Sequence, residues 1–219
     1  MQIDKIESCM EGYRSSKDHA RIVRLIKQQM RTYEIDVLVL CDMFFQKDSF
    51  AYFSVATQIF KDYELYKDKE VFSFVKTWCH QYLNSWSRCD QFCYRILNPM
   101  IETHPSLFHD VCAFKDSANI YMKRAIAVCL IHSSIEFSVY CPWFMVEKAC
   151  DILKEETHIH IQKGIGWLLK YAYLTYPNEV LQYLLEQKHA MSSVILRYAC
   201  ENMKVEDKGM IYHSKQVSL

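Results

Sequence analysis

The stretch of sequence that decides the fold is His160-Ile161-Gln162-Lys163-Gly164-Ile165-Gly166-Trp167-Leu168-Leu169-Lys170. At about 100° per residue, its apolar side chains form one narrow helical stripe that continues toward the C-terminus: Ile161, Ile165, Leu168 and Ala172. Lys163, Trp167 and Lys170 fall together on roughly the opposite face. This pattern predicts an amphipathic helix over residues 158–175 with one buried face.

The opposite face of this helix has two interpretations. A tryptophan between two lysines offers a flat apolar surface beside ammonium groups that attract phosphates. Alternatively, Trp167 packs against the next layer of helices while the lysines stay in water. Gly164 and Gly166 each cost the helix about 1 kcal/mol of propensity, so they indicate close approach of another backbone or of a ligand.

The rest of the chain also has the pattern of helices. With 51% hydrophobic residues and only 4 Gly and 4 Pro, it can bury a large core but lacks the turn residues of an all-β protein. Breaks at Asn84-Ser85, Cys141-Pro142 and Tyr176-Pro177 are typical helix starts. The predicted helices span residues 18–32, 34–46, 49–64, 68–83, 86–101, 104–114, 119–134, 142–154, 158–175, 177–188 and 192–204, with a weaker one at 2–12.

These helices arrive in pairs roughly every 35–45 residues, which is the length scale of HEAT-like repeats. The sequence predicts an all-α, HEAT-like α-solenoid of about six helix pairs, although the period alone fits a helical bundle nearly as well. No linker divides the chain, so we expect one domain over residues 1–208 and a C-terminal tail over 209–219.

Charge and cysteine content restrict the class of protein further. The 26 basic and 26 acidic residues cancel, so any nucleic-acid-binding face must come from their arrangement. A charged N-terminus and no apolar run of about 18 residues predict a cytoplasmic protein with no membrane contact. Of the 10 cysteines, Cys89 and Cys93 could join Cys79 and His80 around zinc, but small buried side chains are the preferred interpretation. We expect no metal and no cofactor.

A second helix, from about Asn119, has a core stripe formed by Met122, Ala125, Ile126 and Cys129. Arg124 is predicted to project away from this stripe, with Lys123 beside it. Ordinary surface charge is the default interpretation of such a pair.

Three stretches resemble the AlkD-like DNA glycosylases. His160–Lys170 followed by Tyr176-Pro177-Asn178 is similar to that family's I-Q-K-A-I-G-W-x-L-R and its proline-started helix. Phe114-Lys115-Asp116-Ser117-Ala118-Asn119-Ile120-Tyr121-Met122-Lys123-Arg124-Ala125 resembles W-x-x-S-D-N-I-W-x-x-R-A, and Ser85-Trp86-Ser87-Arg88-Cys89-Asp90 resembles S-W-W-D-x-V-D. The resemblance covers about residues 40–205.

The resemblance implies a concave cationic groove that holds duplex DNA, with contacts mostly to phosphate and sugar. Active family members release N3- and N7-alkylated purines while an aspartate and aromatic side chains bracket the deoxyribose. An oxocarbenium-like sugar then develops positive charge, which a nearby carboxylate stabilises. By this resemblance we expect DNA-binding residues at Trp86, Phe114, Asn119, Tyr121, Lys123, Arg124, Lys163, Lys170 and Arg197, although Trp86 and Tyr121 fit core aromatics equally well. We also expect a monomer.

The alignment puts Ala118 at the position taken as the family's catalytic aspartate, and Lys170 at an arginine. A methyl group cannot stabilise a cation, and loss of such a group costs about 3–4 kcal/mol of transition-state stabilisation. Asp116 is the nearby carboxylate that could substitute. The sequence therefore favours a protein that binds duplex or distorted DNA with excision lost or weakened. The alternatives are an active alkylpurine glycosylase and a protein–protein scaffold.

Overall fold

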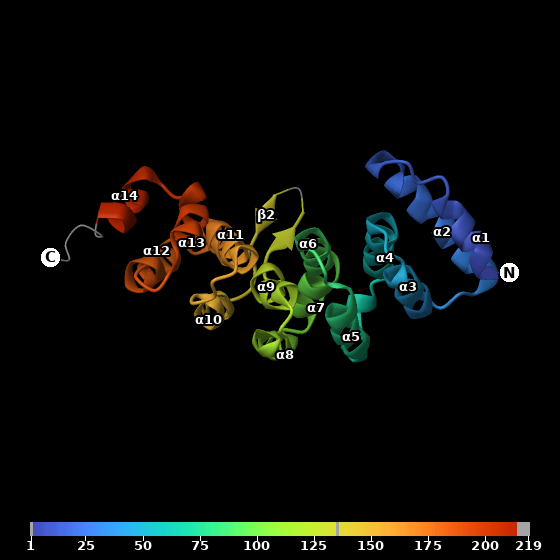
Figure 1. Cartoon of the computed structure of the whole chain (residues 1–219), viewed down its shortest axis with the longest axis horizontal. Coiled ribbons are helices and arrows are strands. Elements are labelled where there is room, and N and C mark those ends of the chain that lie inside the picture. The colour runs from blue at the N-terminus through green and yellow to red at the C-terminus, as the bar shows by residue number, and fades with distance from the viewer. Residues whose placement is uncertain (1, 135, 214–219) are drawn as a thin grey trace. The chain divides into compact units, whose positions relative to one another are not determined.

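The computed structural model describes residues 2–134 and 136–213, and almost all of its regular structure is helical (Figure 1). The predicted all-α fold is confirmed. The chain divides into two compact units, Met1–Leu83 and Asn84–Leu219. The single domain expected over residues 1–208 stays a prediction.

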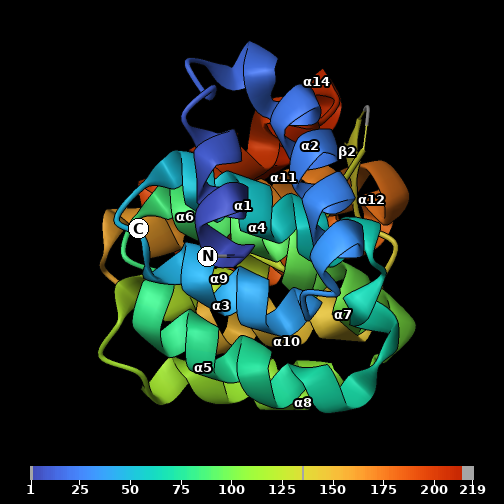
Figure 2. The ribbon, with the colours of Figure 1, turned by 90° about the vertical axis from the view of Figure 1, so that its right-hand side faces the viewer.

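The N-terminal unit contains five α-helices joined by short turns: α1 (Gln2–Met10), α2 (His19–Tyr33), α3 (Val37–Gln46), α4 (Phe50–Asp62) and α5 (Phe72–Tyr82) (Figure 2). Helix α2 packs against α1 and α4, and α3 packs against α4 and α5. At the centre, the buried Trp78 ring contacts Phe45 and Phe60, and its indole N–H donates to Asp42 over 2.9 Å. This unit therefore has its own hydrophobic core.

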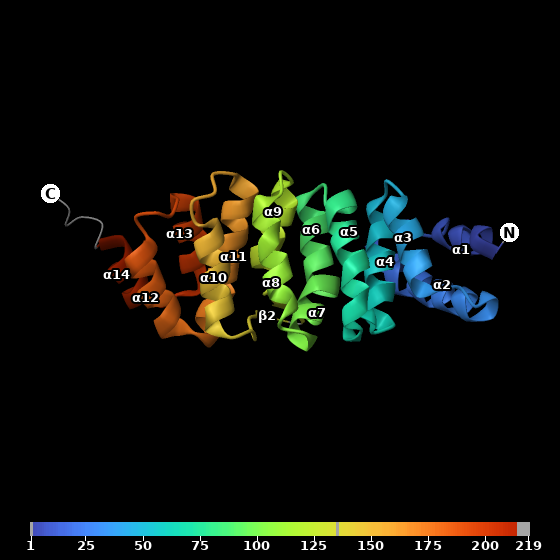
Figure 3. The same cartoon turned by 90° about the horizontal axis from the view of Figure 1, so that it is seen from below.

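The C-terminal unit is a two-layered stack of helices (Figure 3). In the first layer α6 packs against α9, α9 against α11, and α11 against α13, while α8, α10 and α12 pack outside them. The elements are α6 (Trp86–Phe92), α7 (Asn98–Thr103), α8 (Leu107–Cys112), α9 (Ile120–Val128), α10 (Trp143–Leu153), α11 (Ile159–Thr175), α12 (Pro177–Gln187), α13 (Ser193–Ala199) and α14 (Val205–His213).

Side-chain hydrogen bonds between neighbouring helices of this unit recur at nearly constant sequence separation. Asn98 donates to the carbonyl of Cys129, 31 residues away, and Thr175 donates to the carbonyl of Val139, 36 residues away. Tyr183 donates to Asp151 across 32 residues. Segments about one repeat length apart in the sequence thus contact each other, as in a HEAT-like stack. The number of helix pairs stays a prediction.

Local sequence signals account for most helix boundaries. Ser85 caps α6 by accepting from the amide of Arg88, and Pro177 begins α12. The stripe predicted for residues 158–175 is fully buried in α11, and Met122, Ala125, Ile126 and Cys129 are buried in or just after α9. Sequence reasoning therefore identified the core faces of both helices.

The structure also differs from the predicted helices, most clearly in the following places. The helix predicted over 119–134 ends at Val128, and a short antiparallel hairpin follows, formed by β1 (His132–Ser133) and β2 (Phe137–Ser138). A π-helical turn, Cys93–Leu97, interrupts the helix predicted over 86–101. Helix α14 covers the start of the tail predicted over 209–219, and residues 214–219 lie outside the described part. Within that part, no helix combines the length and apolar character needed to span a bilayer.

Gly166 provides a sharp test of the packing between α11 and α13. A Cβ atom at this position would lie 2.6 Å from Tyr198 Cβ and 2.9 Å from the carbonyl oxygen of Ile195. We expect Gly166→Ala to lower the free energy of unfolding by about 1–3 kcal/mol, because overpacking outweighs the gain in helix propensity.

Urea unfolding of the purified variant measures this change, with Gly12→Ala as the control. The Cβ of that control would meet the end of the flexible Arg21 side chain at 3.2 Å, so its stability should stay within about 0.5 kcal/mol of wild type. An equally stable Gly166→Ala variant would show that the two helices are not in the close contact described.

Candidate nucleic-acid pocket

A pocket of about 470 Å³ opens on the first layer of the C-terminal unit. We call it the Asp90 pocket, and all its lining residues come from α6, α9, α11 and α13 or the turn after α13. They are Trp86, Asp90, Arg124, His160, Lys163, Trp167, Lys170, Tyr171, Tyr198 and Glu201. Residues separated by more than a hundred positions in the sequence thus converge on one concave surface.

A buried ion pair lies within the pocket wall. Arg124 Nε donates to Asp90 Oδ1 over 2.7 Å, and Arg124 Nη2 donates to Asp90 Oδ2 over 2.9 Å. The third guanidinium nitrogen donates to the backbone carbonyl of His160 over 2.5 Å. Asp90 and Arg124 are 5% and 4% exposed, so the carboxylate is both shielded from water and fixed in orientation. One guanidinium links α6, α9 and α11.

The glycine spacing in α11 makes room for this guanidinium. A Cβ at Gly164 would lie 3.3 Å from both Cγ and Nη1 of Arg124, tighter than most contacts of this kind. Gly164 therefore lets the Arg124 side chain lie flat against α11, and Gly166 lets α13 approach from the other side. The expectation that a glycine marks close approach of another backbone is confirmed at Gly166, whereas the close neighbour of Gly164 is a side chain.

The charged groups in the pocket influence one another's pKa values. Burial lowers the pKa of the Arg124 guanidinium, but hydrogen bonding and attraction to Asp90 outweigh burial and raise this pKa above its ordinary value. The pKa of His160 is lowered, first by burial and then by repulsion from Arg124, His158 and Lys163. The Arg124 side chain therefore stays charged at neutral pH, whereas the imidazole of His160 is mostly neutral.

Aromatic rings line the pocket together with Asp90. Trp86 begins α6 and is 54% exposed, which is unusual for so large an apolar side chain. Trp167 is half-buried, its ring centroid lies 6.0 Å from Arg124 Cζ, and Phe137 of the hairpin packs against it at 5.4 Å. Trp167 thus contacts neighbouring side chains and also lines the pocket, and its role beside phosphate-binding lysines stays a prediction.

The two lysines of α11 differ in their surroundings. Lys170 Nζ lies 2.5 Å from Glu201 Oε2, so its charge is compensated within the pocket. Lys163 Nζ lies 5.9 Å from the centroid of the Tyr198 ring, and no carboxylate within residues 2–134 and 136–213 pairs with it. Lys163 is therefore the ammonium available to an incoming anion.

The structure brings four of the predicted DNA-binding residues together in this pocket, namely Trp86, Arg124, Lys163 and Lys170. The interpretation of Arg124 as ordinary surface charge is wrong, because α6 and α11 cover that face of α9 and leave the side chain buried. The other predicted residues do not line the pocket: Phe114, Asp116, Asn119, Tyr121, Lys123 and Arg197.

These other residues have local roles. Phe114 is a 5% exposed core side chain, and Asn119 caps α9 by accepting from the amide of Tyr121. Lys123 pairs with Glu156 over 2.6 Å. Arg197 Cζ lies 5.4 Å from the Tyr198 ring centroid, and the ring of Tyr121 lies 5.9 Å from that of His160. Tyr121 and Arg197 thus each contact a ring that lines the pocket.

Ala118 and Asp116, the two positions considered for the catalytic carboxylate, also lie outside the pocket. Ala118 is exposed, just before the start of α9. Asp116 pairs with its neighbour Lys115 over 3.0 Å and its side chain is 74% exposed. Within the described part of the chain, no three His, Cys, Asp or Glu side chains gather as metal ligands.

Sequence reasoning missed Asp90 as a functional residue. Its only local signal is the stretch Ser85–Asp90, which places Trp86 and Asp90 four residues apart on one side of α6. His160, Tyr171, Tyr198 and Glu201 were also missed.

The fold and the pocket together define an all-α repeat protein with a carboxylate-containing, aromatic pocket on one layer of helices. The family model of the DNA alkylation repair enzymes matches residues 15–203, so the chain belongs to the DNA alkylation repair enzyme family. No curated protein matches the sequence significantly.

The buried pair yields a stability prediction. Arg124→Met would leave the Asp90 carboxylate buried and unpaired, so we expect the free energy of unfolding to fall by about 3–5 kcal/mol. Urea unfolding followed by far-UV circular dichroism measures the loss.

Lys123→Met is the matched control, since Lys123 is the next residue of α9 and its pair with Glu156 is more accessible to water. This control should lose no more than about 1 kcal/mol. Equal losses in the two variants would contradict a special role for the Asp90–Arg124 pair.

Proposed function

We propose that the protein is a DNA N-glycosylase that releases N3- or N7-alkylated purines, with Asp90 as the carboxylate that faces the reacting sugar. The observation that carries this proposal is an oriented, buried carboxylate beside an exposed indole in a pocket that also holds lysines. Membership of the DNA alkylation repair family supplies the class of substrate.

The chemistry requires little from the protein. An alkylated purine already carries positive charge, so its bond to the sugar breaks with both electrons going to the base, which leaves as a neutral molecule. The sugar becomes an oxocarbenium-like cation that the Asp90 carboxylate stabilises. Water then adds to the anomeric carbon of the sugar and loses its proton to solvent or to Asp90, which leaves an abasic site.

Arg124 would position Asp90 and leave part of its carboxylate available. A carboxylate has about four acceptor sites, and Arg124 occupies two of them. The remaining sites are free for a sugar cation or a water molecule. The indole faces of Trp86 and Trp167 would add cation–π attraction of about 0.5–2 kcal/mol to a positively charged nucleotide.

Phosphate contacts would come from the lysines at the pocket. Lys163 lacks a competing carboxylate among the described residues, and Lys170 would exchange its pair with Glu201 for a phosphate. Such contacts are indifferent to base sequence and weaken as salt is added.

The absence of a carboxylate at position 118 supports loss of excision only if that position faces the substrate. Ala118 is exposed and lies outside the Asp90 pocket, so Asp90 is the stronger candidate for the acid. Two alternatives compete with this proposal: DNA binding without excision, and a protein–protein scaffold. Measurements of base release and of duplex binding distinguish them.

The excision test uses duplex DNA containing N7-methylguanine, with enzyme in excess and free base measured over time. We expect wild type to release the base, and Asp90→Asn to slow release about 100- to 1,000-fold because the neutral amide cannot stabilise the sugar cation. Asp116→Asn and Ala118→Asp should both match wild type.

Thermal unfolding and duplex binding of Asp90→Asn show whether the variant still folds and binds. If wild type releases no base and Ala118→Asp gains activity, the proposal for Asp90 is wrong and excision was lost at position 118.

Binding of unmodified duplex, followed by fluorescence anisotropy across a range of salt concentrations, tests the role of Lys163. Loss of one phosphate contact in Lys163→Ala should reduce the slope of log K against log salt by about 0.9.

Glu201→Gln should bind more tightly than wild type, because it frees Lys170. Lys154→Ala is the control for Lys163→Ala, because Lys154 pairs with Asp151 outside the pocket. Salt-independent or undetectable binding would favour the scaffold.

A further inference from the structure

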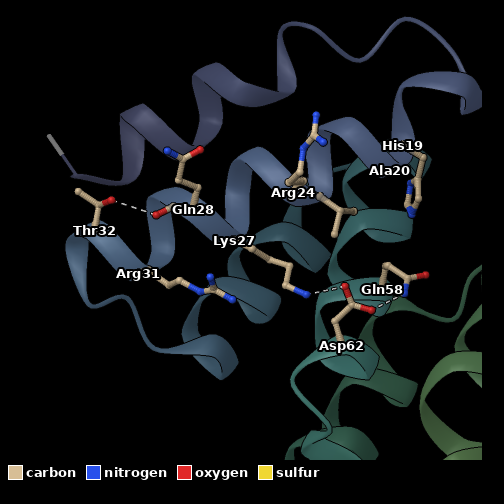
Figure 4. A pocket seen from close by; sticks show the side chains of 10 residues that line it. His19, Ala20, Arg24, Lys27, Gln28, Arg31, Thr32, Gln58 and Asp62 are labelled. Atoms are coloured by element: carbon tan, nitrogen blue, oxygen red, sulfur yellow. Dashed lines mark hydrogen bonds and ion pairs between the residues drawn. The ribbon is translucent and has the colours of Figure 1, made fainter.

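A separate cationic groove lies on the N-terminal unit. Arg24, Lys27 and Arg31 are spaced three and four residues apart on α2, so they share one face of the helix. They line a pocket of about 730 Å³ together with Gln58 and Asp62 of α4. Figure 4 shows Lys27 reaching Asp62, with Arg24 and Arg31 on either side of it along α2. We call this the α2 groove.

The charge of the α2 groove is only partly compensated. Lys27 Nζ lies 2.9 Å from Asp62 Oδ2, and Gln58 donates to the other oxygen of Asp62 over 2.7 Å. Arg24 and Arg31 are both exposed, and no carboxylate in the described part of the chain pairs with either. The groove therefore keeps two uncompensated guanidinium groups.

The sequence of α2 concentrates positive charge in a chain whose formal net charge is zero. Residues 19–33 contain three arginines and one lysine but no Asp or Glu. The remaining arginine, Arg21, pairs with Asp18 just before the helix. Because the chain has as many acidic as basic residues, this local excess marks an anion-attracting face.

The shape of the groove fits a chain of anions better than one isolated anion. At a rise of 1.5 Å per residue, Arg24 and Arg31 start about 10.5 Å apart along α2. The neutral Lys27–Asp62 pair lies between them, so the two guanidiniums form two anion sites. A nucleic-acid strand presents successive phosphates at a rise of about 3.4 Å, so the spacing spans about three nucleotides.

We propose that the α2 groove is a second nucleic-acid site, in which Arg24 and Arg31 bind backbone phosphates of undamaged nucleic acid. Planar guanidinium groups donate paired hydrogen bonds to phosphate oxygens, which suits this role. The side chains of Gln28 and Thr32 line the same groove and add neutral hydrogen-bonding groups. The choice of ligand rests on the proposed function, but the site involves none of the residues of the Asp90 pocket.

The test compares full-length wild type with the double variant Arg24→Gln/Arg31→Gln on unmodified duplex and single-stranded DNA. Loss of two phosphate contacts should reduce the slope of log K against log salt on duplex by about 1.8 and weaken binding at low salt at least tenfold. Asp62→Asn should strengthen binding, because it frees the ammonium of Lys27.

The matched control is Arg14→Gln/Lys76→Gln, which removes the same charge from two exposed positions of the N-terminal unit that do not line the groove. If the two double variants give the same salt slope, the proposal is wrong. It is also wrong if the groove variant loses binding only to pyrophosphate or to phosphatidylserine vesicles, because the ligand is then a small anion or a membrane.

This experiment fails independently of the excision test. Absence of base release in wild type contradicts the role of Asp90 but leaves the duplex-binding comparison intact. An unchanged salt slope contradicts the α2 groove but leaves base release intact.

Discussion

The two hydrogen bonds between Arg124 and Asp90 are the interaction on which the C-terminal unit and its pocket both depend. They join α6 to α9, and the third donor of the same guanidinium joins α9 to α11 through the carbonyl of His160. A buried ion pair is weak evidence for stability, because desolvation offsets much of the attraction. Its specific effect is to hold one carboxylate in a fixed orientation at the wall of a pocket.

This constraint is the physical basis for proposing a cationic substrate. Asp90 is neutralised by a partner behind it, while the pocket in front offers indole rings and unused acceptor sites. Hydrolysis of a neutral glycosidic bond also needs a general acid for the leaving group. Under the proposed function, the lowered pKa of His160 makes its imidazole a weak candidate for a general acid, so we expect substrates whose leaving group already carries charge.

How far the sequence predicts the fold depends on how many residues separate the interacting partners along the chain. Stripes such as Ile161, Ile165 and Leu168 lie within one helix, and they located the buried face of α11 correctly. The partner of Arg124 is 34 residues away in sequence, and no local pattern reveals it. The side of α9 opposite its core stripe was therefore taken as solvent-exposed, although a neighbouring helix covers it in a stacked repeat.

The candidate site was predictable only in part for the same reason. Resemblance to a family identified Trp86, Lys163 and Lys170, which the structure brings together. It also directed attention to Ala118, whose exposed position before α9 is visible only in three dimensions. The α2 groove gave no sequence motif at all, because its signal is the absence of acidic residues along one helix.

The most direct test of the account is the affinity for a duplex that carries a cationic pyrrolidine in place of one deoxyribose, compared with a duplex that carries a neutral tetrahydrofuran there. The first mimics the charge of the sugar cation, and transition-state mimics bind at least about 100-fold more tightly than ground-state ligands. If Asp90 stabilises that cation, wild type will prefer the pyrrolidine duplex and Asp90→Asn will lose the preference. Equal affinity of wild type for the two duplexes would contradict the account.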